Sequence, residues 1–272
     1  MPRWSALALV PSCPRALVPS GSNNMTADND WLLGPNAVEA QLESDPSRIL
    51  EVLIEDGKRN PRVDGLAQRL KQAGIAVQRS PRAQLDKRVG SDRHQGIAAR
   101  WRLPEALDEG DLVRMIEAAA MPPLILVLDG VQDPHNLGAC IRTAAAAGAM
   151  AVVVPKDRAV GLTPTVVRAS AGMAAKLPLV RVTNLARALE RIKKAGVWVG
   201  GAAGEATESV YQADLKGPIA IVMGSEGEGL RELTRKTCDY LWKIPIAPNV
   251  ESLNVSVAAG VFLFEVVRQR QC

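Results

Sequence analysis

Short apolar runs alternate with segments of helical periodicity through the second half of the chain, from residue 124 to residue 268. Such runs are typical of strands that are buried on both faces of a parallel sheet, and the segments between them are long enough for covering helices. We predict strands at 124–128, 151–154, 179–182, 197–200, 219–223 and 241–244. We predict helices at 137–147, 163–171, 185–195, 230–237 and 253–268. The pattern indicates an α/β fold with a parallel sheet.

The first half of the chain shows a similar alternation on a smaller scale. The predicted elements are strands at 49–54, 75–78 and 97–101, and helices at 36–42, 63–73 and 81–89. Asn36 is placed to cap the first helix, and Gly74 is placed to end the second. We therefore divide the chain into a small α/β domain at 30–102, a linker at 103–122 with a helical piece at 112–120, and a larger domain at 123–272.

The first 24 residues differ from the rest of the chain. Pro11 ends their short apolar stretch before it reaches the length of a signal-peptide core. We expect residues 1–24 to be a disordered leader or a misassigned start, with the functional start near Met25. A targeting peptide is the alternative.

Positive charge is concentrated in one part of the chain. The formal net charge is +4, yet residues 57–102 contain 12 Lys and Arg against 3 acidic residues. A basic block of this kind predicts a surface that binds RNA phosphates, and the residues we expect there are Arg79, Arg82, Lys87 and Arg88. The alternative is a solvated, arginine-rich face.

Composition argues against several classes of protein. A hydrophobic content of 47% excludes wholesale disorder. The four cysteines are widely spaced and only two histidines occur, so a disulfide framework, a metal site and a Ser-His-Asp triad are all disfavoured. Cysteine usage fits a reducing compartment, and we expect a cytoplasmic protein. No apolar run reaches the length that spans a bilayer, so we expect no membrane association.

Three segments carry polar residues directly after predicted strands. The first leads from Asp129 to a helix that Asn136 opens and that carries Arg142. The second is the loop 224–229 (GSEGEG), and the third begins at Ser252. Because the carboxyl ends of parallel strands lie at one edge of a sheet, we expect these segments to form one site.

Each segment also has a purely structural interpretation. The glycine loop can be a strained turn, Asn136 or Ser252 can simply cap a helix, and Arg142 can pair with Asp129 or Asp133. The glycines let backbone N–H groups approach a ligand, but the loop lacks the G-x-G-x-x-G spacing of dinucleotide sites. Its two acids disfavour a bare pyrophosphate and suit a ligand that carries a cation or hydroxyl groups.

The last predicted helix is apolar almost all round. Val257, Val261 and Phe264 recur at helical spacing. Such a helix is buried either in the core or against a partner subunit.

The three motifs in this order, with LLGPNAVEA near the start of the first domain, resemble the SpoU/TrmH branch of the SPOUT methyltransferases. Similarity is greatest to bacterial 23S rRNA guanosine 2′-O-methyltransferases of the RlmB type, and it covers residues 31–270. The resemblance implies a deep trefoil knot in the parallel-sheet domain and an N-terminal domain like ribosomal protein L30. It also implies S-adenosyl-L-methionine as cofactor without a metal, 23S rRNA as substrate, and a homodimer formed through the catalytic domain and its last helix.

The resemblance also assigns site residues by matching motif positions. The implied catalytic and substrate-positioning residues are Asn136, Arg142, Glu226, Ser252 and Asn254. The implied cofactor-binding residues are Gly204, Gly224, Glu226, Ile244 and Leu253. Because a guanidinium has no ready base form near pH 7, we assign Arg142 to phosphate binding and to stabilisation of alkoxide charge.

Three alternatives differ from rRNA methylation. A tRNA 2′-O-methyltransferase would share every motif. A non-catalytic RNA-binding assembly factor would share the fold but would not need Arg142, Glu226 and Asn254, whose presence favours activity. A nucleotide-dependent oxidoreductase on a doubly wound sheet would need the glycine fingerprint that the chain lacks.

Overall fold

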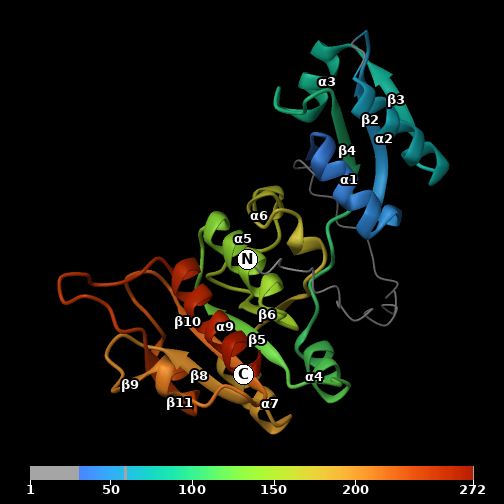
Figure 1. Cartoon of the computed structure of the whole chain (residues 1–272). Helices are drawn as coiled ribbons and strands as arrows, with labels where there is room; N and C mark the ends of the chain where they lie inside the picture. Colours follow the sequence, from blue (N-terminus) through green and yellow to red (C-terminus); the bar gives the residue numbers. More distant parts are fainter. Residues whose placement is uncertain (1–30, 58–59, 272) are drawn as a thin grey trace, which may run out of the picture.

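The computed structural model describes residues 31–57 and 60–271, and the expected leader at 1–24 lies outside this part. Two β-sheets are formed by separate stretches of the chain, one between residues 31 and 101 and the other between residues 124 and 243. Figure 1 shows them as two bodies joined by a single connecting segment.

The first sheet has four strands in the order β1-β4-β2-β3, with only the β2–β3 pair parallel. Its strands are β1 (Trp31–Leu33), β2 (Ile49–Glu55), β3 (Val77–Ser80) and β4 (Ile97–Trp101). The helices are α1 (Pro35–Ser44), η1 (Pro46–Arg48), α2 (Pro61–Gln72) and α3 (Arg82–Val89). The predicted alternation is confirmed, whereas β1 was not predicted and β3 lies two residues later than expected.

The start of α1 differs from the prediction. Gly34, not Asn36, precedes the helix, and Pro35 occupies its first position. Asn36 therefore lies in the first turn, where its side chain accepts a hydrogen bond from Arg62 of α2. Gly74 follows α2 as expected, in the left-handed conformation with φ 78°.

The connecting segment is partly built into the second body. Helix α4 (Glu109–Glu117) begins three residues earlier than predicted, because Asp108 and Asp111 form a reciprocal capping box at its start. Leu107 forms a β-bridge to Val180, and α4 packs against α7 (Leu185–Lys194). This part of the predicted linker thus covers the larger sheet.

The second sheet has seven strands in the order β7-β6-β5-β10-β8-β11-β9, and every pair is parallel. Its strands are β5 (Leu124–Asp129), β6 (Ala151–Pro155), β7 (Leu179–Val182), β8 (Trp198–Ala202), β9 (Glu208–Ser209), β10 (Ile219–Gly224) and β11 (Tyr240–Lys243). The remaining helices are α5 (Pro134–Ala146), α6 (Pro164–Ala169), η2 (Met173–Ala175), η3 (Val210–Gln212), α8 (Glu232–Thr237) and α9 (Val255–Gln271). The predicted parallel α/β sheet is confirmed.

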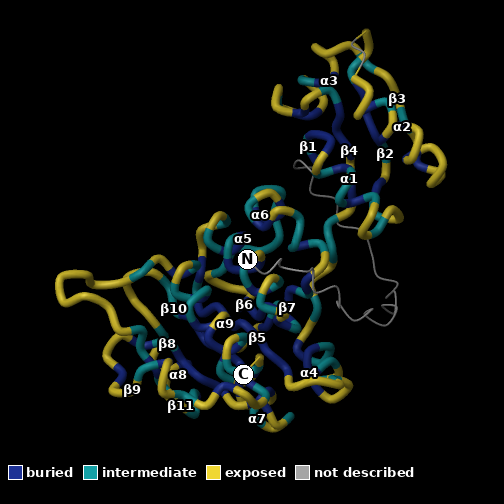
Figure 2. The backbone as a smooth tube through the Cα atoms, viewed as in Figure 1, coloured by how far each residue is buried: buried dark blue, intermediate teal, exposed yellow. Residues whose placement is uncertain are grey.

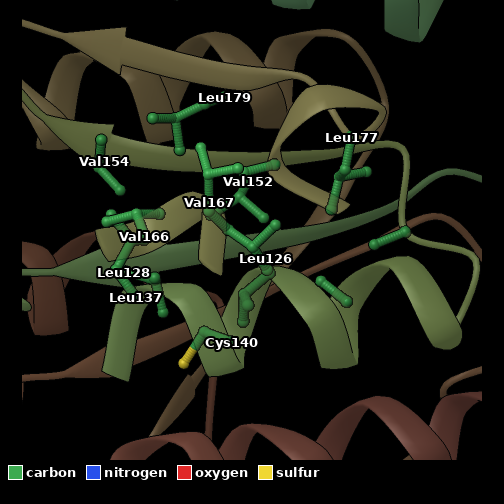
Figure 3. Packing of buried hydrophobic residues seen from close by; sticks show 14 of the residues in the cluster. Leu126, Leu128, Leu137, Cys140, Val152, Val154, Val166, Val167, Leu177 and Leu179 are labelled. Carbon is green, nitrogen blue, oxygen red and sulfur yellow. The ribbon is translucent and has the colours of Figure 1, made fainter. Parts of the chain in front are cut away.

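Alternate residues of the central strands pack into opposite helical layers. Leu126 and Leu128 of β5 contact the layer that contains Leu137 and Cys140 of α5 (Figure 3). Ile125 of the same strand belongs to the separate cluster built with α4 and α7. The central strands are therefore buried on both faces, as Figure 2 shows. Among the described residues, no helix is both long and apolar enough to cross a membrane.

Candidate active site

The site is organised by the neighbouring parallel strands β5 and β10. Their register pairs Asp129 with Gly224, so both strands end at the same level of the sheet. The segments that follow these two residues are the first and second predicted motifs. Adjacent carboxyl ends thus bring together two motifs that are far apart in sequence.

Asn136 projects from the first turn of α5 and does not cap that helix. Asp133 is the cap, because its carboxylate accepts hydrogen bonds from the backbone N–H groups of His135 (3.1 Å) and Asn136 (3.3 Å). The capping interpretation of Asn136 is therefore wrong. Its side chain is left available for contacts outside the helix.

A closed triangle of hydrogen bonds joins the three motifs. Asn136 Nδ2 donates to Glu226 Oε1 at 3.1 Å, and Asn254 Nδ2 donates to the same oxygen at 2.7 Å. Asn254 Nδ2 also lies 3.0 Å from Asn136 Oδ1, which accepts from it. Two amides thus orient one carboxylate oxygen, and all three residues remain at least partly exposed to solvent.

The loop that carries Glu226 is a closed turn. The backbones of Ser225 and Gly229 exchange two hydrogen bonds of 3.1 Å each. A Cβ on Gly224 would lie 2.1 Å from the carbonyl carbon of Gly229, so the closure requires glycine at this position.

Beyond the loop, the buried carboxylate of Asp129 accepts hydrogen bonds from the backbone N–H and the side chain of Arg231 (3.1 and 2.5 Å). Asp129 is therefore not the partner of Arg142.

The third motif places Asn254 at the start of the last helix. Its Oδ1 accepts hydrogen bonds from the backbone N–H and the hydroxyl of Ser256 (2.9 and 2.6 Å), and α9 starts at Val255. Asn254, rather than Ser252, thus has the capping contact. One side chain both begins the helix and completes the triangle with Glu226.

A cavity of about 320 Å³ lies beside the triangle and shares Glu226 with it. Its lining includes six residues that the resemblance assigns to the site: Gly204, Gly224, Glu226, Ile244, Ser252 and Leu253. The lining also includes Met223, Trp242 and Phe262, which were not predicted. The strand position of Trp242, two residues before Ile244, is the signal that could have revealed it.

Arg142 stands apart from this cluster within one chain. Its side chain is exposed, and it makes no hydrogen bond or ion pair with another residue of the described ranges 31–57 and 60–271. It follows Asn136 by six positions, so the two residues lie on different faces of α5. The guanidinium is therefore available to bind a group from outside the described residues.

Two thiols near the site are held neutral. Burial raises the pKa of the Cys140 thiol from 9.0 to about 12, and the Glu226 carboxylate acts in the same direction. Burial also raises the pKa of Cys238 to about 12, with Asp239 adding to the effect. Neither thiol is therefore a nucleophile near neutral pH. Within the described part of the chain, no group of three or more His, Cys, Asp or Glu residues could hold a metal ion.

The predicted RNA-binding cations lie on the smaller sheet and its helix α3, and all four are exposed. Arg79 pairs with Asp64 at 2.9 Å, and Arg88 pairs with Glu51 at 2.9 Å. Arg82 is 3.9 Å from Glu55. Acidic neighbours thus offset part of the positive charge that the sequence suggests.

Two family models match the chain. The model described as the SpoU rRNA Methylase family matches residues 123–264. The model described as RNA 2′-O ribose methyltransferase substrate binding matches residues 31–107. The first covers the seven-stranded sheet and the cavity, and the second covers the four-stranded sheet.

Similar proteins and structures agree with these models. The 23S rRNA (guanosine-2′-O-)-methyltransferase RlmB of Xanthomonas campestris is 51% identical over 246 residues, which are 90% of this chain and 99% of the relative. The enzyme of the same name from Photobacterium profundum is 52% identical, over 89% and 99% of the two chains.

Two solved structures share the fold over most of their length. A structure described as an RNA 2′-O ribose methyltransferase is 30% identical, with a TM-score of 0.70 and coverage of 89% of both chains. An AdoMet-bound rRNA methyltransferase from Sinorhizobium meliloti is 25% identical, with a TM-score of 0.70 and coverage of 88% of this chain and 86% of that one. On the family model and the identity to the relatives, the chain belongs to the SpoU rRNA Methylase family.

Proposed function

We propose that this protein is an S-adenosyl-L-methionine-dependent methyltransferase that modifies the ribose 2′-hydroxyl of a guanosine in 23S rRNA. The observation that carries the proposal is the triangle of Asn136, Glu226 and Asn254 beside the cavity. The names of the relatives supply the substrate class.

The cavity fits the proposed cofactor in size and chemistry. Its volume of about 320 Å³ lies within the range of small-molecule sites. The acids Glu226 and Glu251 line it together with apolar residues, which suits a ligand with a cationic centre and an apolar ring system. When bound, S-adenosyl-L-methionine supplies an electrophilic methyl group on a sulfonium. Gly224, Ile244 and Leu253 are proposed to hold it, with Gly204 and Glu226 completing the pocket.

We assign the chemical roles from side-chain properties. Asn136 and Asn254 fix the carboxylate of Glu226, so that it can position the ribose. Arg142 binds an RNA phosphate and stabilises the negative charge that develops on the 2′-oxygen, because its guanidinium stays protonated near pH 7. Ser252 lies at the cavity wall and positions substrate. The proton passes to a substrate phosphate or to water.

A homodimer is part of the proposal. Val257 and Phe264 of α9 are 53% and 48% exposed, and Val261 lies between them on the same face. Another face of the helix is buried in the core of its own chain through Ala259, Phe262 and Leu263, so the expected core burial is confirmed for that face and not for the stripe. Covering the stripe with a second copy would remove it from water. We also propose that the segment around the cavity is threaded as a trefoil knot, as the resemblance implies.

We propose that the four-stranded sheet and its helices form an L30-like RNA-binding domain at residues 30–102, joined by the segment 103–122 to a catalytic domain at 123–272. The match of the substrate-binding model to residues 31–107 supports this role. Arg79, Arg82, Lys87 and Arg88 are its proposed phosphate contacts. Work on rRNA and two protonated thiols, one buried and one half-buried, suit the cytoplasm.

The test is an assay of the purified protein with tritiated S-adenosyl-L-methionine and unmodified 23S rRNA, with tRNA in parallel. We expect label as 2′-O-methylguanosine in 23S rRNA alone. Label only in tRNA would retain the chemistry and overturn the substrate. Cofactor binding without label in either RNA would support the non-catalytic assembly factor.

The basic residues allow a separate test of RNA binding. Neutralising Arg79, Arg82, Lys87 and Arg88 should weaken RNA binding and flatten its salt dependence. On single strands, the log-log slope should change by about 0.7 for each phosphate that is no longer bound. An unchanged slope would show that these residues do not touch phosphate. Replacing Arg187 and Arg191, which pair with Glu109 beside the other sheet, provides the matched control.

A further inference from the structure

Trp242 lies near the end of β11, where a buried aromatic side chain reaches the wall of the cavity. Its side chain is only 3% exposed and lines the cavity that contains Glu226. None of the family motifs includes it. The indole is therefore a buried aromatic surface at a proposed cofactor site, without an assigned role.

Gly200 of the neighbouring strand makes room for this indole. A Cβ on Gly200 would lie 1.9 Å from Cζ3 of Trp242 and 2.7 Å from Cε3. In the β8–β11 register, Gly200 is opposite Tyr240 and Ala202 is opposite Trp242, so the ring crosses diagonally over Gly200. Gly200 has a negative φ, and the missing side chain is thus required by the indole rather than by the backbone.

The indole also belongs to a stack of three aromatic rings. Tyr240 stacks on Trp242 with ring centres 5.4 Å apart and an interplanar angle of 10°. Trp198 follows at 5.6 Å from Tyr240, and both of these rings are partly exposed. The stack runs from the surface to the cavity wall. Only Tyr240 touches the indole within it, and Tyr240 together with Gly200 restricts the conformation of Trp242.

The cavity lining combines two carboxylates with several apolar side chains. The carboxylates of Glu226 and Glu251 suit the cationic centre of the cofactor, whereas Trp242, Met223 and Phe262 suit a flat, uncharged ring. A restricted indole stabilises a stacked or edge-to-face contact with a heteroaromatic ring, because little side-chain entropy is lost on binding.

We propose that Trp242 is a cofactor-contacting residue that packs against the adenosyl part of S-adenosyl-L-methionine, and that Gly200 and Tyr240 position it for this contact. The inference rests on the proposed function and adds a residue outside the family motifs. Because the contact is with the adenosyl part, the contribution of Trp242 to binding should not depend on the charge on the cofactor's sulfur.

The experiment measures equilibrium binding of S-adenosyl-L-methionine and of uncharged S-adenosyl-L-homocysteine by calorimetry. Trp242→Leu should raise the Kd of both ligands equally, by about fivefold to tenfold, as expected when one aromatic partner is removed. Trp242→Phe should restore most of the affinity. The matched control is Trp198→Leu, the same change at the exposed end of the stack, which should leave both Kd values unchanged.

Gly200 provides an independent test, because it does not line the cavity within the described ranges. Gly200→Ala should weaken binding in the native background by displacing the indole. The same change should have a much smaller effect in the Trp242→Leu background, where the space is free. Additive effects in this cycle would overturn the positioning role of Gly200.

The outcomes separate the inference from the proposed function. Unchanged Kd values in a folded Trp242→Leu variant would overturn the inference, and so would a weakening confined to the charged cofactor. Wild-type protein that binds neither ligand would instead overturn the proposed function itself. Thermal unfolding of each variant verifies that a change in Kd occurs in folded protein.

Discussion

Asn254 Nδ2 donates a 2.7 Å hydrogen bond to Oε1 of Glu226, and the two residues are 28 positions apart in the chain. Asn254 also caps α9 through its other side-chain atom, Oδ1. The start of the last helix and the orientation of the Glu226 carboxylate therefore depend on one side chain. Asn136 completes the arrangement from α5.

Replacing Asn136 should show whether this triangle serves the reaction. Asn136→Asp exchanges a donor to Glu226 for a second carboxylate, which repels the first. We expect methylation to fall by at least about a hundredfold, as when a preorganised polar group is removed, with little change in cofactor Kd. Single-turnover rates and calorimetry measure the two effects.

Two acids of the same loop provide a matched pair for that experiment. Glu226→Gln removes the charge that both amides orient, and it should also slow methylation strongly. Glu228→Gln makes the same change on an exposed residue that neither lines the cavity nor forms a bond within the described part of the chain. Equal activity of the two variants would contradict a role for the triangle.

Arg142 should matter for chemistry and not for folding. Because its side chain is exposed and pairs with no other described residue, Arg142→Ala is expected to leave the unfolding temperature and cofactor Kd unchanged. Methylation should be lost, and Arg142→Lys should recover only part of it, since lysine cannot bind phosphate in a bidentate manner. Failure of Arg142→Ala to bind the cofactor would instead indicate a structural arginine.

Gly224→Ala should disrupt the glycine loop. The added Cβ would lie 2.1 Å from the Gly229 carbonyl carbon, so the turn that holds Glu226 must open. We expect a stability decrease of about 1–3 kcal/mol and no cofactor binding, measured by denaturant unfolding and calorimetry. Gly217→Ala is the control, because no atom of the described residues lies within 4 Å of its added Cβ. Unimpaired cofactor binding by a folded Gly224→Ala protein would contradict the assignment of the loop.

The buried thiol of Cys140 and the half-buried thiol of Cys238 predict a pH dependence. Cys140 and Cys238 have pKa values raised from 9.0 to about 12, so both remain protonated in the folded protein at pH 8. Alkylation by iodoacetamide at pH 8, followed residue by residue with mass spectrometry, should be slow for both until denaturant is added. Their contribution to the free energy of unfolding is complete below pH 9 and is lost as the pH rises towards 12, because the unfolded chain releases these protons first. Rapid alkylation of folded protein would contradict the raised pKa values of these thiols.

The exposed stripe on α9 predicts a change of oligomeric state. Phe264→Glu places a charge in the proposed dimer interface, and we expect a dimer of the native chain to become a monomer in sedimentation equilibrium. Leu233→Glu is the control, since this residue is 61% exposed on α8, outside the proposed interface. A native chain that is monomeric at high concentration would remove the dimer from the proposal.

Helix starts show how far local signals determine the fold. Asn60 and Thr163 precede prolines and cap α2 and α6, and Asn184 caps α7. At α1 and α5 the prediction places the start at an asparagine, although Pro35 and Pro134 precede it. Proline favours the first helical position, so these prolines mark the true starts. The error is local, and the sequence contains the information to correct it.

The sequence by itself determined the parallel sheet, because uninterrupted apolar runs are stable only where both faces are covered, and it placed the motifs at the ends of strands. The contact of Asn136 with Glu226 was decided by the tertiary structure, since it depends on β10 lying beside β5 although β6, β7, β8 and β9 intervene in the chain. Tertiary structure also decided that Asn254 and not Ser252 caps α9. It likewise decided that the indole of Trp242 packs over Gly200. Each depends on which distant segments become neighbours, and periodicity along the chain carries no record of that.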